Sequence, residues 1–282
     1  MFNVSFPGFG WEFTVSPVAF SIGGLTVRWY GLIIAIGLCL AVAYGCKVAK
    51  RFDITADKLL NCVIVGTITG IIGARLYYVL FSWDMYKDDL MGIFRINEGG
   101  LAIYGGIIGA LIGGLIVAKI TKMNIAGLLD VAALGFLIGQ GIGRWGNFFN
   151  QEAYGTATDL PWRMVSEGTN MVGVHPCFLY ESIWCLLGFV LLHFFSKSKF
   201  RKYYGQVGLI YLVWYGFERM FVEGLRTDSL YTPILGLRVS QVLSFVLFGA
   251  GIIALIILAY KKKSNIKAIA EENKAKEKVT NG

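Results

Sequence analysis

The stretch that decides the fold reads IAGLLDVAALGFLIGQGIG at residues 125–143 and continues as RWGNFFNQEAYG at residues 144–155. The first part is long and apolar enough to cross about 30 Å of hydrocarbon as a helix. The second part brings four polar side chains to the point where that helix should leave the bilayer: Arg144, Asn147, Asn150 and Glu152. A charge near membrane depth costs about 2.5–3.5 kcal/mol on insertion scales, so it marks a candidate functional site. The alternative is a plain helix end, anchored by Trp145 and capped by glycine.

The rest of the chain repeats the apolar pattern of residues 125–143. Hydrophobic residues make up 56% of the chain, charged residues only 16%, and mean hydropathy is +0.61. Soluble domains carry about 25% charged residues, so a soluble class is excluded. Six further segments have the length of a membrane span: 30–49, 59–81, 101–119, 176–196, 205–223 and 240–260. We therefore predict an all-α, polytopic protein with seven transmembrane helices in one domain, residues 1–260, and no cleaved signal peptide.

The basic residues predict the orientation of these spans. Seventeen of the 26 Lys and Arg residues fall in the loops 47–58, 119–124 and 197–204 and in the tail from residue 261. Because cytoplasmic loops carry the Lys and Arg excess, these segments should be cytoplasmic and the N-terminus should lie outside. The polar tail, residues 261–282, should be flexible. Its lysines are attracted to an anionic leaflet, so the net charge of +8 does not require a nucleic acid partner.

The two sides of the predicted membrane protein also differ in the kind of basic residue. The cytoplasmic segments carry mostly lysine, whereas eight of the nine basic residues on the outer side are arginine. A guanidinium is a planar fork of donors that binds phosphate or carboxylate in a bidentate manner. The outer face is therefore expected to bind an anion. The segment 144–175 should form a small cap over the site on that face.

Glycine stripes predict close helix packing. Gly105, Gly109 and Gly113 repeat every four residues, and so do the glycines at 135, 139 and 143. Small residues at this spacing let helix backbones approach closely in a membrane. We expect the third and fourth spans to pack tightly against each other or a neighbour, with Tyr104 in the first turn of the third span and close to Arg144.

Further ionisable residues gather toward the outer ends of the spans: Arg75, His175, Glu181, Glu218, Arg219, Glu223 and Arg226. For Arg75, Glu181 and Glu218, a mutually paired buried network is as good an interpretation as a direct catalytic role. Two histidines and no CxxC pair argue against a zinc site, and no metal or other cofactor is expected. We do not expect a cysteine nucleophile.

Five motifs of the chain resemble those of the bacterial prolipoprotein diacylglyceryl transferases. They occur in the family's order: RWYG at 28–31, LAIYGGIIG at 101–109, GRWGNFFNQEAYG at 143–155, HPCFLYE at 175–181 and ERMFVEGLRTD at 218–228. The resemblance implies transfer of the diacylglyceryl group of phosphatidylglycerol to the lipobox cysteine thiol of a prolipoprotein signal peptide. A thioether forms and glycerol phosphate leaves, in the first step of lipoprotein maturation. It also implies a bacterial cytoplasmic membrane, with the active site toward the extracytoplasmic leaflet and its lipids.

The resemblance also supplies candidate site residues. Arg144 would hold the lipid phosphate. The candidate catalytic residues are Arg144, Arg226, Tyr104 and Glu152. The candidate substrate-binding residues are Arg144, Asn147, Tyr30, Gly155, His175 and Glu223. Arginines on the phosphate would stabilise the charge that builds on the leaving group, and their positive field would favour ionisation of the attacking thiol.

One position departs from the family pattern. Many members carry histidine before the paired glycines of the third span, where this chain has Tyr104. A phenol with a pKa near 10 is a poor base at neutral pH, so Tyr104 is expected to donate a hydrogen bond, or the base lies elsewhere. The alternative function is a membrane transporter or channel for an anionic solute. That alternative would place polar residues through both leaflets and is not supported by any internal repeat.

Overall fold

The computed structural model describes residues 1–95, 99–232 and 236–280. The chain divides into two compact units. One combines Met1–Gly37 with Phe136–Gly282, and the other is the continuous stretch Leu38–Gly135. Nothing in the sequence indicated this division.

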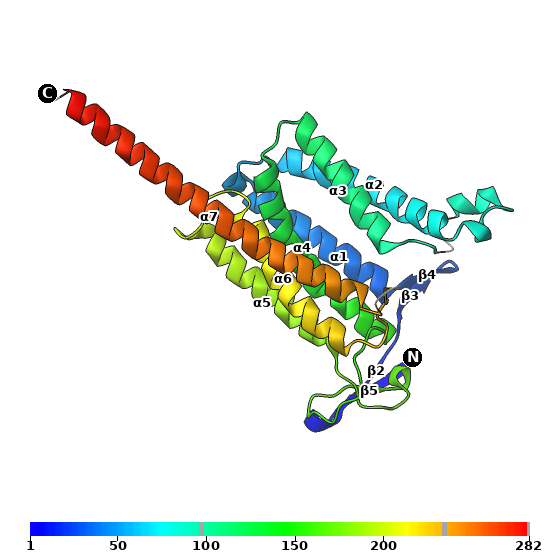
Figure 1. The fold of residues 1–282 in the computed structure, drawn as a ribbon. Helices are drawn as coiled ribbons and strands as arrows, with labels where there is room; N and C mark the ends of the chain where they lie inside the picture. The colour runs from blue at the N-terminus through cyan, green and yellow to red at the C-terminus, as the bar shows by residue number, and fades with distance from the viewer. Residues whose placement is uncertain (96–98, 233–235, 281–282) are drawn as a thin grey trace. The chain divides into compact units, whose positions relative to one another are not determined.

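Seven α-helices account for most of the described residues (Figure 1). They are α1 Trp29–Val48, α2 Ala56–Phe81, α3 Ile103–Ile120, α4 Ile125–Asn150, α5 Cys177–Lys197, α6 Gln206–Leu225 and α7 Val239–Thr280. The short 3-10 helices are η1 Pro7–Phe9, η2 Ala49–Phe52, η3 Trp83–Met85, η4 Leu90–Phe94 and η6 Glu167–Thr169. Each predicted span therefore corresponds to one helix. The largest difference at a C-terminal end is in α7, which continues to Thr280 and so into the segment expected to be a flexible tail.

Six of the seven helices in the described part of the chain are long and apolar enough to cross a membrane. The exception is α6, whose second half carries Glu218, Arg219 and Glu223. The prediction of a mostly helical, multi-pass protein is confirmed.

The end of α4 corrects the boundary predicted at residue 143. The helix continues through Asn150 and ends at Gln151, whose φ of +53° is left-handed. Arg144 and Asn147 thus lie on the last turns of a helix, and the cap begins only after them. The glycines suggested an earlier end, yet Gly146 is held in the helix by the ring of Tyr30 on α1, which would lie 2.8 Å from a Cβ at this position. Tertiary packing here overrides local propensity.

Five short strands show that the predicted all-α class was too narrow. β1 (Phe2–Phe6) pairs antiparallel with both β2 (Trp11–Val15) and β5 (Val165–Ser166), and β3 (Val18–Ile22) pairs with β4 (Leu25–Arg28). The alternation in β1, with Val4 and Phe6 buried, is the period-two pattern of a half-buried strand. The sequence alone did not predict β1, because a strand of five residues is a weak signal beside the apolar spans.

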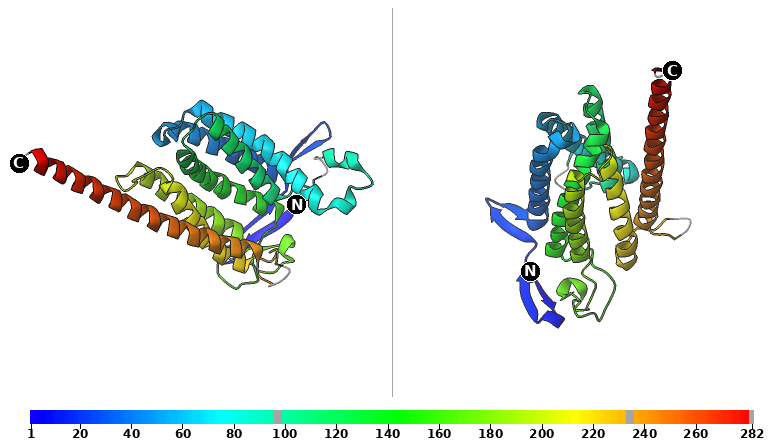
Figure 2. Two further views of the ribbon diagram at one scale, coloured as in Figure 1. Left: turned by 45° about the horizontal axis from the view of Figure 1, so that its top comes forward. Right: turned by 90° about the vertical axis from the view of Figure 1, so that its left-hand side faces the viewer.

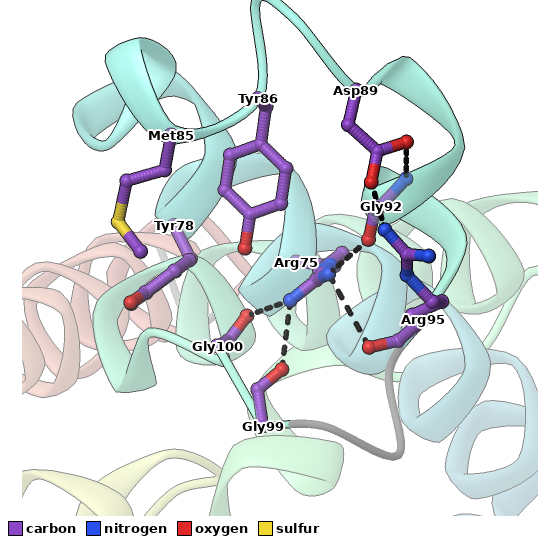
Figure 3. A pocket seen from close by; sticks show the side chains of 9 residues that line it. All are labelled: Arg75, Tyr78, Met85, Tyr86, Asp89, Gly92, Arg95, Gly99 and Gly100. Carbon is purple, nitrogen blue, oxygen red and sulfur yellow. Dashed lines mark hydrogen bonds and ion pairs between the residues drawn. The ribbon is translucent and has the colours of Figure 1, made fainter.

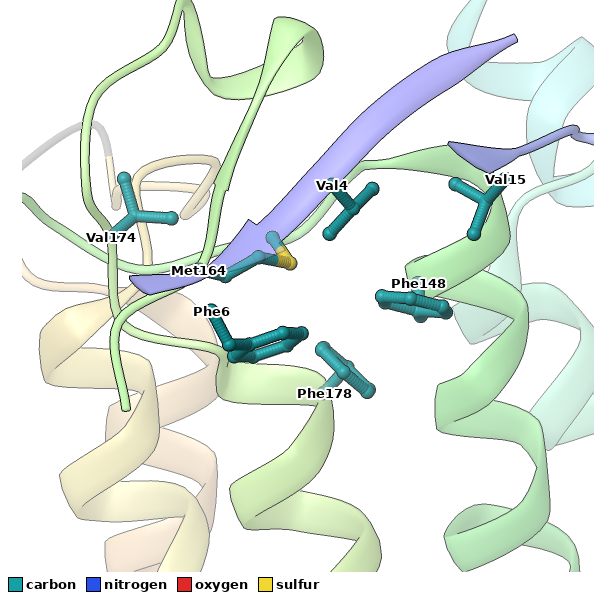
Figure 4. Close-up of a cluster of buried hydrophobic side chains, with 7 residues drawn as sticks. All are labelled: Val4, Phe6, Val15, Phe148, Met164, Val174 and Phe178. Carbon is teal, nitrogen blue, oxygen red and sulfur yellow. The ribbon is translucent and has the colours of Figure 1, made fainter. Parts of the chain in front are cut away.

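A hydrophobic cluster joins this small sheet to the helix ends (Figure 4). Phe148 of α4 and Phe178 of α5 stack at 4.8 Å between ring centroids, and Phe13 of β2 reaches Phe148 at 6.1 Å. The buried members of the cluster are Val4, Phe6, Val15, Phe148, Met164, Val174 and Phe178. The cap is therefore packed onto the outer ends predicted for α4 and α5.

The glycine stripe of α3 packs against α2, as the neighbouring ribbons in Figure 2 illustrate. Cβ atoms added to Gly105 or Gly109 would overlap backbone atoms of Gly73 or Thr69 on α2. The expected close packing of the third span is confirmed, and its partner is the neighbour before it in sequence rather than α4. The stripe of α4 faces α1, with Gly143 against Ile34.

Candidate active site

The polar residues of the signature form one hydrogen-bonded array at the end of α4. Arg144 and Asn147 lie one helical turn apart, and Arg144 Nη1 donates to Asn147 Oδ1 at 3.3 Å. The amides of Asn147 and Asn150 both donate to Glu152 Oε1, at 3.0 and 3.3 Å. The left-handed turn at Gln151 brings Glu152 back toward the helix end. The four residues that the sequence singled out are therefore brought together.

A buried carboxylate on α5 gathers three arginines. Glu181 forms an ion pair with Arg144 Nη2 of α4, another with Arg219 Nη1 of α6 at 2.9 Å, and a longer one with Arg226 Nη1 at 3.8 Å. The Glu181 side chain is only 3% exposed. Removing one partner of such a buried pair costs about 3–5 kcal/mol, because the remaining charge is left uncompensated. For Glu181, the network interpretation is the one the contacts support.

Acidic side chains other than Glu181 also bind Arg219 of α6 and Arg226, which directly follows that helix. Arg219 Nη2 lies 2.7 Å from Glu223 Oε2, four residues later on the same helix. Arg226 donates from Nε and Nη2 to the two oxygens of Asp228, at 2.9 and 2.7 Å. The bidentate bond from Arg226 lowers the pKa of Asp228. Burial by itself would lower the pKa of Arg226, but the bond and charge of Asp228 raise it above its usual value. Asp228 was not among the predicted site residues, although it directly follows the RT of LRTD.

Exposure separates Arg144 from the other two arginines. The Arg144 side chain is 22% exposed, against 11% for Arg219 and 12% for Arg226. Its planar fork is thus oriented by Asn147 and Glu181 while part of it stays open to a ligand.

A second link keeps α4 and α5 in register beneath this site. Trp145 Nε1 donates to Ser182 Oγ at 3.1 Å, and Ser182 Oγ donates to the carbonyl of Gly141 at 2.7 Å. Trp145 directly follows Arg144 in the sequence, and Ser182 directly follows Glu181. Trp145, considered above as an interfacial anchor, therefore positions the two helices that carry the pair.

Gly155 lies where three segments meet. Its N–H donates to the His175 carbonyl at 2.9 Å, and it forms a bridge with Arg226. A Cβ here would lie 2.7 Å from His175 Cβ and 2.9 Å from Cys177 Sγ, so the position admits only glycine without rearrangement. Gly155 thus lets the cap approach both α5 and the end of α6.

His175 sits in a hydrogen-bonded group of the cap. Its Nδ1 lies 3.2 Å from Tyr180 Oη, which also accepts a bond from Trp162 Nε1 at 2.7 Å. Burial lowers the pKa of His175, so the ring is neutral at pH 7. On α1, Tyr30 lies against Gly146 of α4, beside the signature.

Comparison of the sequence with known proteins points to the same family as the motifs. The sequence pattern described as prolipoprotein diacylglyceryl transferase matches residues 17–257. A phosphatidylglycerol–prolipoprotein diacylglyceryl transferase of Clostridioides difficile is 46% identical over 250 residues, 88% of this chain and 98% of that protein. Those of Finegoldia magna and Streptococcus pneumoniae are 46% and 45% identical, covering 87% and 92% of this chain and 96% and 100% of their own lengths. This chain belongs to the prolipoprotein diacylglyceryl transferase family.

Family membership confirms the resemblance, and it favours a transferase over the transporter alternative. Tyr104, the departure from the family pattern, is the second residue of α3, so its place in the first turn is as predicted. Its proximity to Arg144 stays a prediction. In the unit that carries Tyr104, the structure instead draws attention to Arg75.

Arg75 on α2 is a buried arginine whose donors are all used by the backbone (Figure 3). Its five N–H groups donate to carbonyls of two loop segments that flank a cavity of about 250 Å³: Gly92, Ile93 and Arg95, and Gly99 and Gly100. The bonds range from 2.6 to 3.4 Å. For Arg75, the structural interpretation is therefore the one supported: it holds the backbone at residues 92–95 and at residues 99–100, and the second of these segments leads into α3 and Tyr104.

Proposed function

We propose that this chain transfers the diacylglyceryl group of phosphatidylglycerol to prolipoproteins. One observation carries the proposal: the partly open guanidinium of Arg144, held by Asn147 and Glu181 in a chain that matches the family over residues 17–257. A fixed, planar donor pair at the end of an apolar helix suits the phosphate of a membrane phospholipid. The relatives act on phosphatidylglycerol and prolipoprotein by name, and the chain covers nearly their full length.

The chemistry follows from the proposed placement of the phosphate on Arg144. The thiolate of the lipobox cysteine attacks the glycerol carbon of the diacylglyceryl group and forms a C–S bond. The C–O bond to phosphate breaks, and its electron pair leaves with the phosphate oxygen as glycerol phosphate. Arg144 and Arg226 stabilise the charge that develops there, since donors fixed in advance need little reorganisation.

The other candidate residues receive supporting roles in the proposal. Asn147 and Glu152 fix the orientation of Arg144 through the array at the end of α4. Glu223 holds Arg219, and Gly155 admits the cap segment that carries His175. Tyr30, against Gly146 of the signature, and His175, whose carbonyl accepts the N–H of Gly155, contribute to substrate binding. Tyr104 is assigned the role of a hydrogen-bond donor.

We propose further that α6 is a seventh membrane span and that the site faces the extracytoplasmic leaflet of the bacterial cytoplasmic membrane. Three helix ends support this placement: the C-terminal ends of α4 and α6 and the N-terminal end of α5 meet at the arginine cluster. The predicted topology assigns these three ends to the outer side. Arg219 and Glu223 of α6 form a buried ion pair with each other. This pairing removes much of the cost of placing their charges at membrane depth.

Cysteine accessibility tests this orientation. A single cysteine placed at Arg201, in the loop between α5 and α6, should react with a membrane-impermeant thiol reagent only after the cells are opened. A cysteine in place of Asp159, in the cap, should react in intact cells and serves as the matched control. Labelling of residue 201 from outside intact cells would contradict the proposed topology.

The proposed activity is tested by incubating the purified protein with phosphatidylglycerol vesicles and a lipobox peptide. Mass spectrometry should detect a thioether-linked diacylglyceryl peptide and free glycerol phosphate in equal amounts. A matched peptide with serine in place of the lipobox cysteine should give neither product. If the wild-type protein forms no thioether in this assay, the proposed function is wrong.

A further inference from the structure

Glu218 on α6 is a buried acid that the mechanism so far does not use. It is 6% exposed, and among the described residues neither of its carboxyl oxygens has a hydrogen-bond partner. The other buried carboxylates of the same region behave differently: Glu181 contacts three arginines and Glu223 contacts Arg219. Because burying an unpaired carboxyl is costly, proteins rarely leave one without a partner unless a ligand or a reaction uses it.

Its place in the fold is just below the arginine cluster. Glu218 precedes Arg219 in sequence, and on α6 it shares a face with Tyr211 and Val222, both buried. Tyr211 receives a hydrogen bond from Gln140 of α4 at 3.0 Å, so this face points between the helices. One turn from the Arg144–Glu181 pair, α4 packs closely on α5: a Cβ on Gly141 would lie 3.0 Å from Leu186 Cγ and 3.4 Å from Cys185 Cβ.

The charged and titratable groups that act on Glu218 come from all three helices. Arg144 lies on α4, Glu181 on α5, and Arg219 and Arg226 on α6 and directly after it. Tyr215 and Cys185 are the remaining titratable neighbours. Burial favours the protonated form of Glu218, whereas three cations against one further anion favour the ionised form. Such a group can take up and release a proton while the arginine pairs stay intact.

The reaction needs a proton acceptor that the family pattern does not provide here. The substrate thiol must lose its proton before the sulfur attacks, and Tyr104 stands where many members carry a histidine. A phenol is a poor base at neutral pH, whereas a carboxylate next to the phosphate-binding arginines is a chemically competent one.

We propose that Glu218 accepts the proton of the substrate thiol in this chain. The S–H bond breaks, the proton passes to a Glu218 carboxylate oxygen, and the sulfur electron pair forms the C–S bond as the C–O bond to phosphate breaks. After glycerol phosphate is released, the proton passes from Glu218 to water and the carboxylate is restored. This inference rests on the proposed transferase function and assigns a catalytic residue within it.

The test exchanges Glu218→Gln, which keeps the size of the side chain and removes the acceptor. The turnover rate should fall by about 10²–10⁴-fold, the usual contribution of a general base, while KM for phosphatidylglycerol changes little. The loss should shrink as the pH rises, because hydroxide then ionises the thiol. Glu218→Asp should recover part of the rate. Glu12→Gln, on the exposed strand β2, is the matched control and should leave the rate unchanged.

A lipobox peptide with selenocysteine separates this role from a structural one. A selenol ionises at lower pH than a thiol, so it needs no acceptor at neutral pH. The Glu218→Gln variant should therefore regain most of the wild-type rate with the selenocysteine peptide, whereas a distorted site would stay slow with both peptides. If Glu218→Gln turns over the cysteine peptide near the wild-type rate, or if selenocysteine does not restore the variant, Glu218 is not the acceptor. Wild-type product formation in the same assay keeps the proposed function distinct from this outcome.

Discussion

Arg75 and Arg144 are both arginines of apolar helices, yet they are held in opposite ways. Arg75 gives all five of its N–H groups to backbone carbonyls of neighbouring loop segments, which can accept but cannot be exchanged for a ligand without unfolding the loop. Arg144 is oriented by the side chains of Asn147 and Glu181 and keeps 22% of its surface exposed. The comparison shows that depth in a helix does not decide the role of an arginine. The nature of its partners does.

The exchange to lysine at both positions should separate the two roles, and Arg144→Lys should have the larger effect. An ammonium keeps the charge but cannot offer a planar donor pair to phosphate. We expect a loss of about 2–4 kcal/mol in transition-state stabilisation, measured as kcat/KM with a lipobox peptide, and little change in melting temperature. A lysine variant that turns over near the wild-type rate would show that bidentate phosphate binding is the wrong role.

Arg75→Lys should affect stability instead of chemistry. One ammonium has three donors and cannot replace five fixed bonds, so buried carbonyls are left without a partner. We expect the free energy of unfolding to fall by about 2–3 kcal/mol, measured by denaturant unfolding in detergent. The turnover rate of the folded fraction should stay within about threefold of wild type, less than 1 kcal/mol. A stable but inactive variant would place Arg75 in the reaction and remove the contrast with Arg144.

Tyr104 lies in the first turn of α3, shortly after Gly99 and Gly100, whose carbonyls accept from Arg75, and Tyr104→Phe tests its role. If Tyr104 donates one hydrogen bond to substrate, its loss should cost about 1–2 kcal/mol of activity. The pH–rate profile should rise with pH as we expect for the wild type, because the thiol and its acceptor are unchanged. A variant that is nearly inactive at every pH would identify Tyr104 as the proton acceptor, and the role of Glu218 would then be contradicted.

The smallest effect is expected at His175, whose pKa is lowered by burial. Below the ordinary value near 6.5, the unfolded chain takes up a proton that the folded chain does not. Stability should therefore decrease as the pH falls from 7 toward the lowered pKa. His175→Gln should weaken this dependence by a small amount, on the order of 1 °C in melting temperature between pH 7 and 5. If the melting temperature of the variant depends on pH as strongly as that of the wild type, another group causes the loss of stability at low pH.

The positions of the helices could be predicted from the sequence because a long run of apolar residues is a strong and local signal. The start of α3 at Ile103 and the end of α2 at Phe81 fall within two residues of the predicted spans. The signature residues were also found, since Arg144, Asn147 and Glu152 stand out as polar residues beside an apolar span. Their closeness in the sequence sufficed to predict that they would lie together.

The contact partners of these residues could not be predicted from the sequence, because they depend on how segments far apart in the chain meet. Glu181 was left between two interpretations until three arginines from other segments were seen around it. The carbonyls that hold Arg75 belong to loop backbone, which no side-chain pattern reveals. Strand β5 has two residues and is defined only by its pairing with β1. The end of α4 was misplaced because glycines under a packed tyrosine do not break a helix.

The pairing of β1 with β5 also constrains the order in which the chain can assemble. Asn3 bonds Glu167 across 164 residues, so the ribosome must complete α1 through α4 and most of the cap before this sheet can close. The stretch Leu38–Gly135, which contains the whole α2–α3 interface, is complete by then. β1 therefore has no partner on its β5 side until after the whole unit Leu38–Gly135 has been synthesised. A nascent chain halted between residues 136 and 164 would have a complete α2–α3 pair but no β1–β5 pairing.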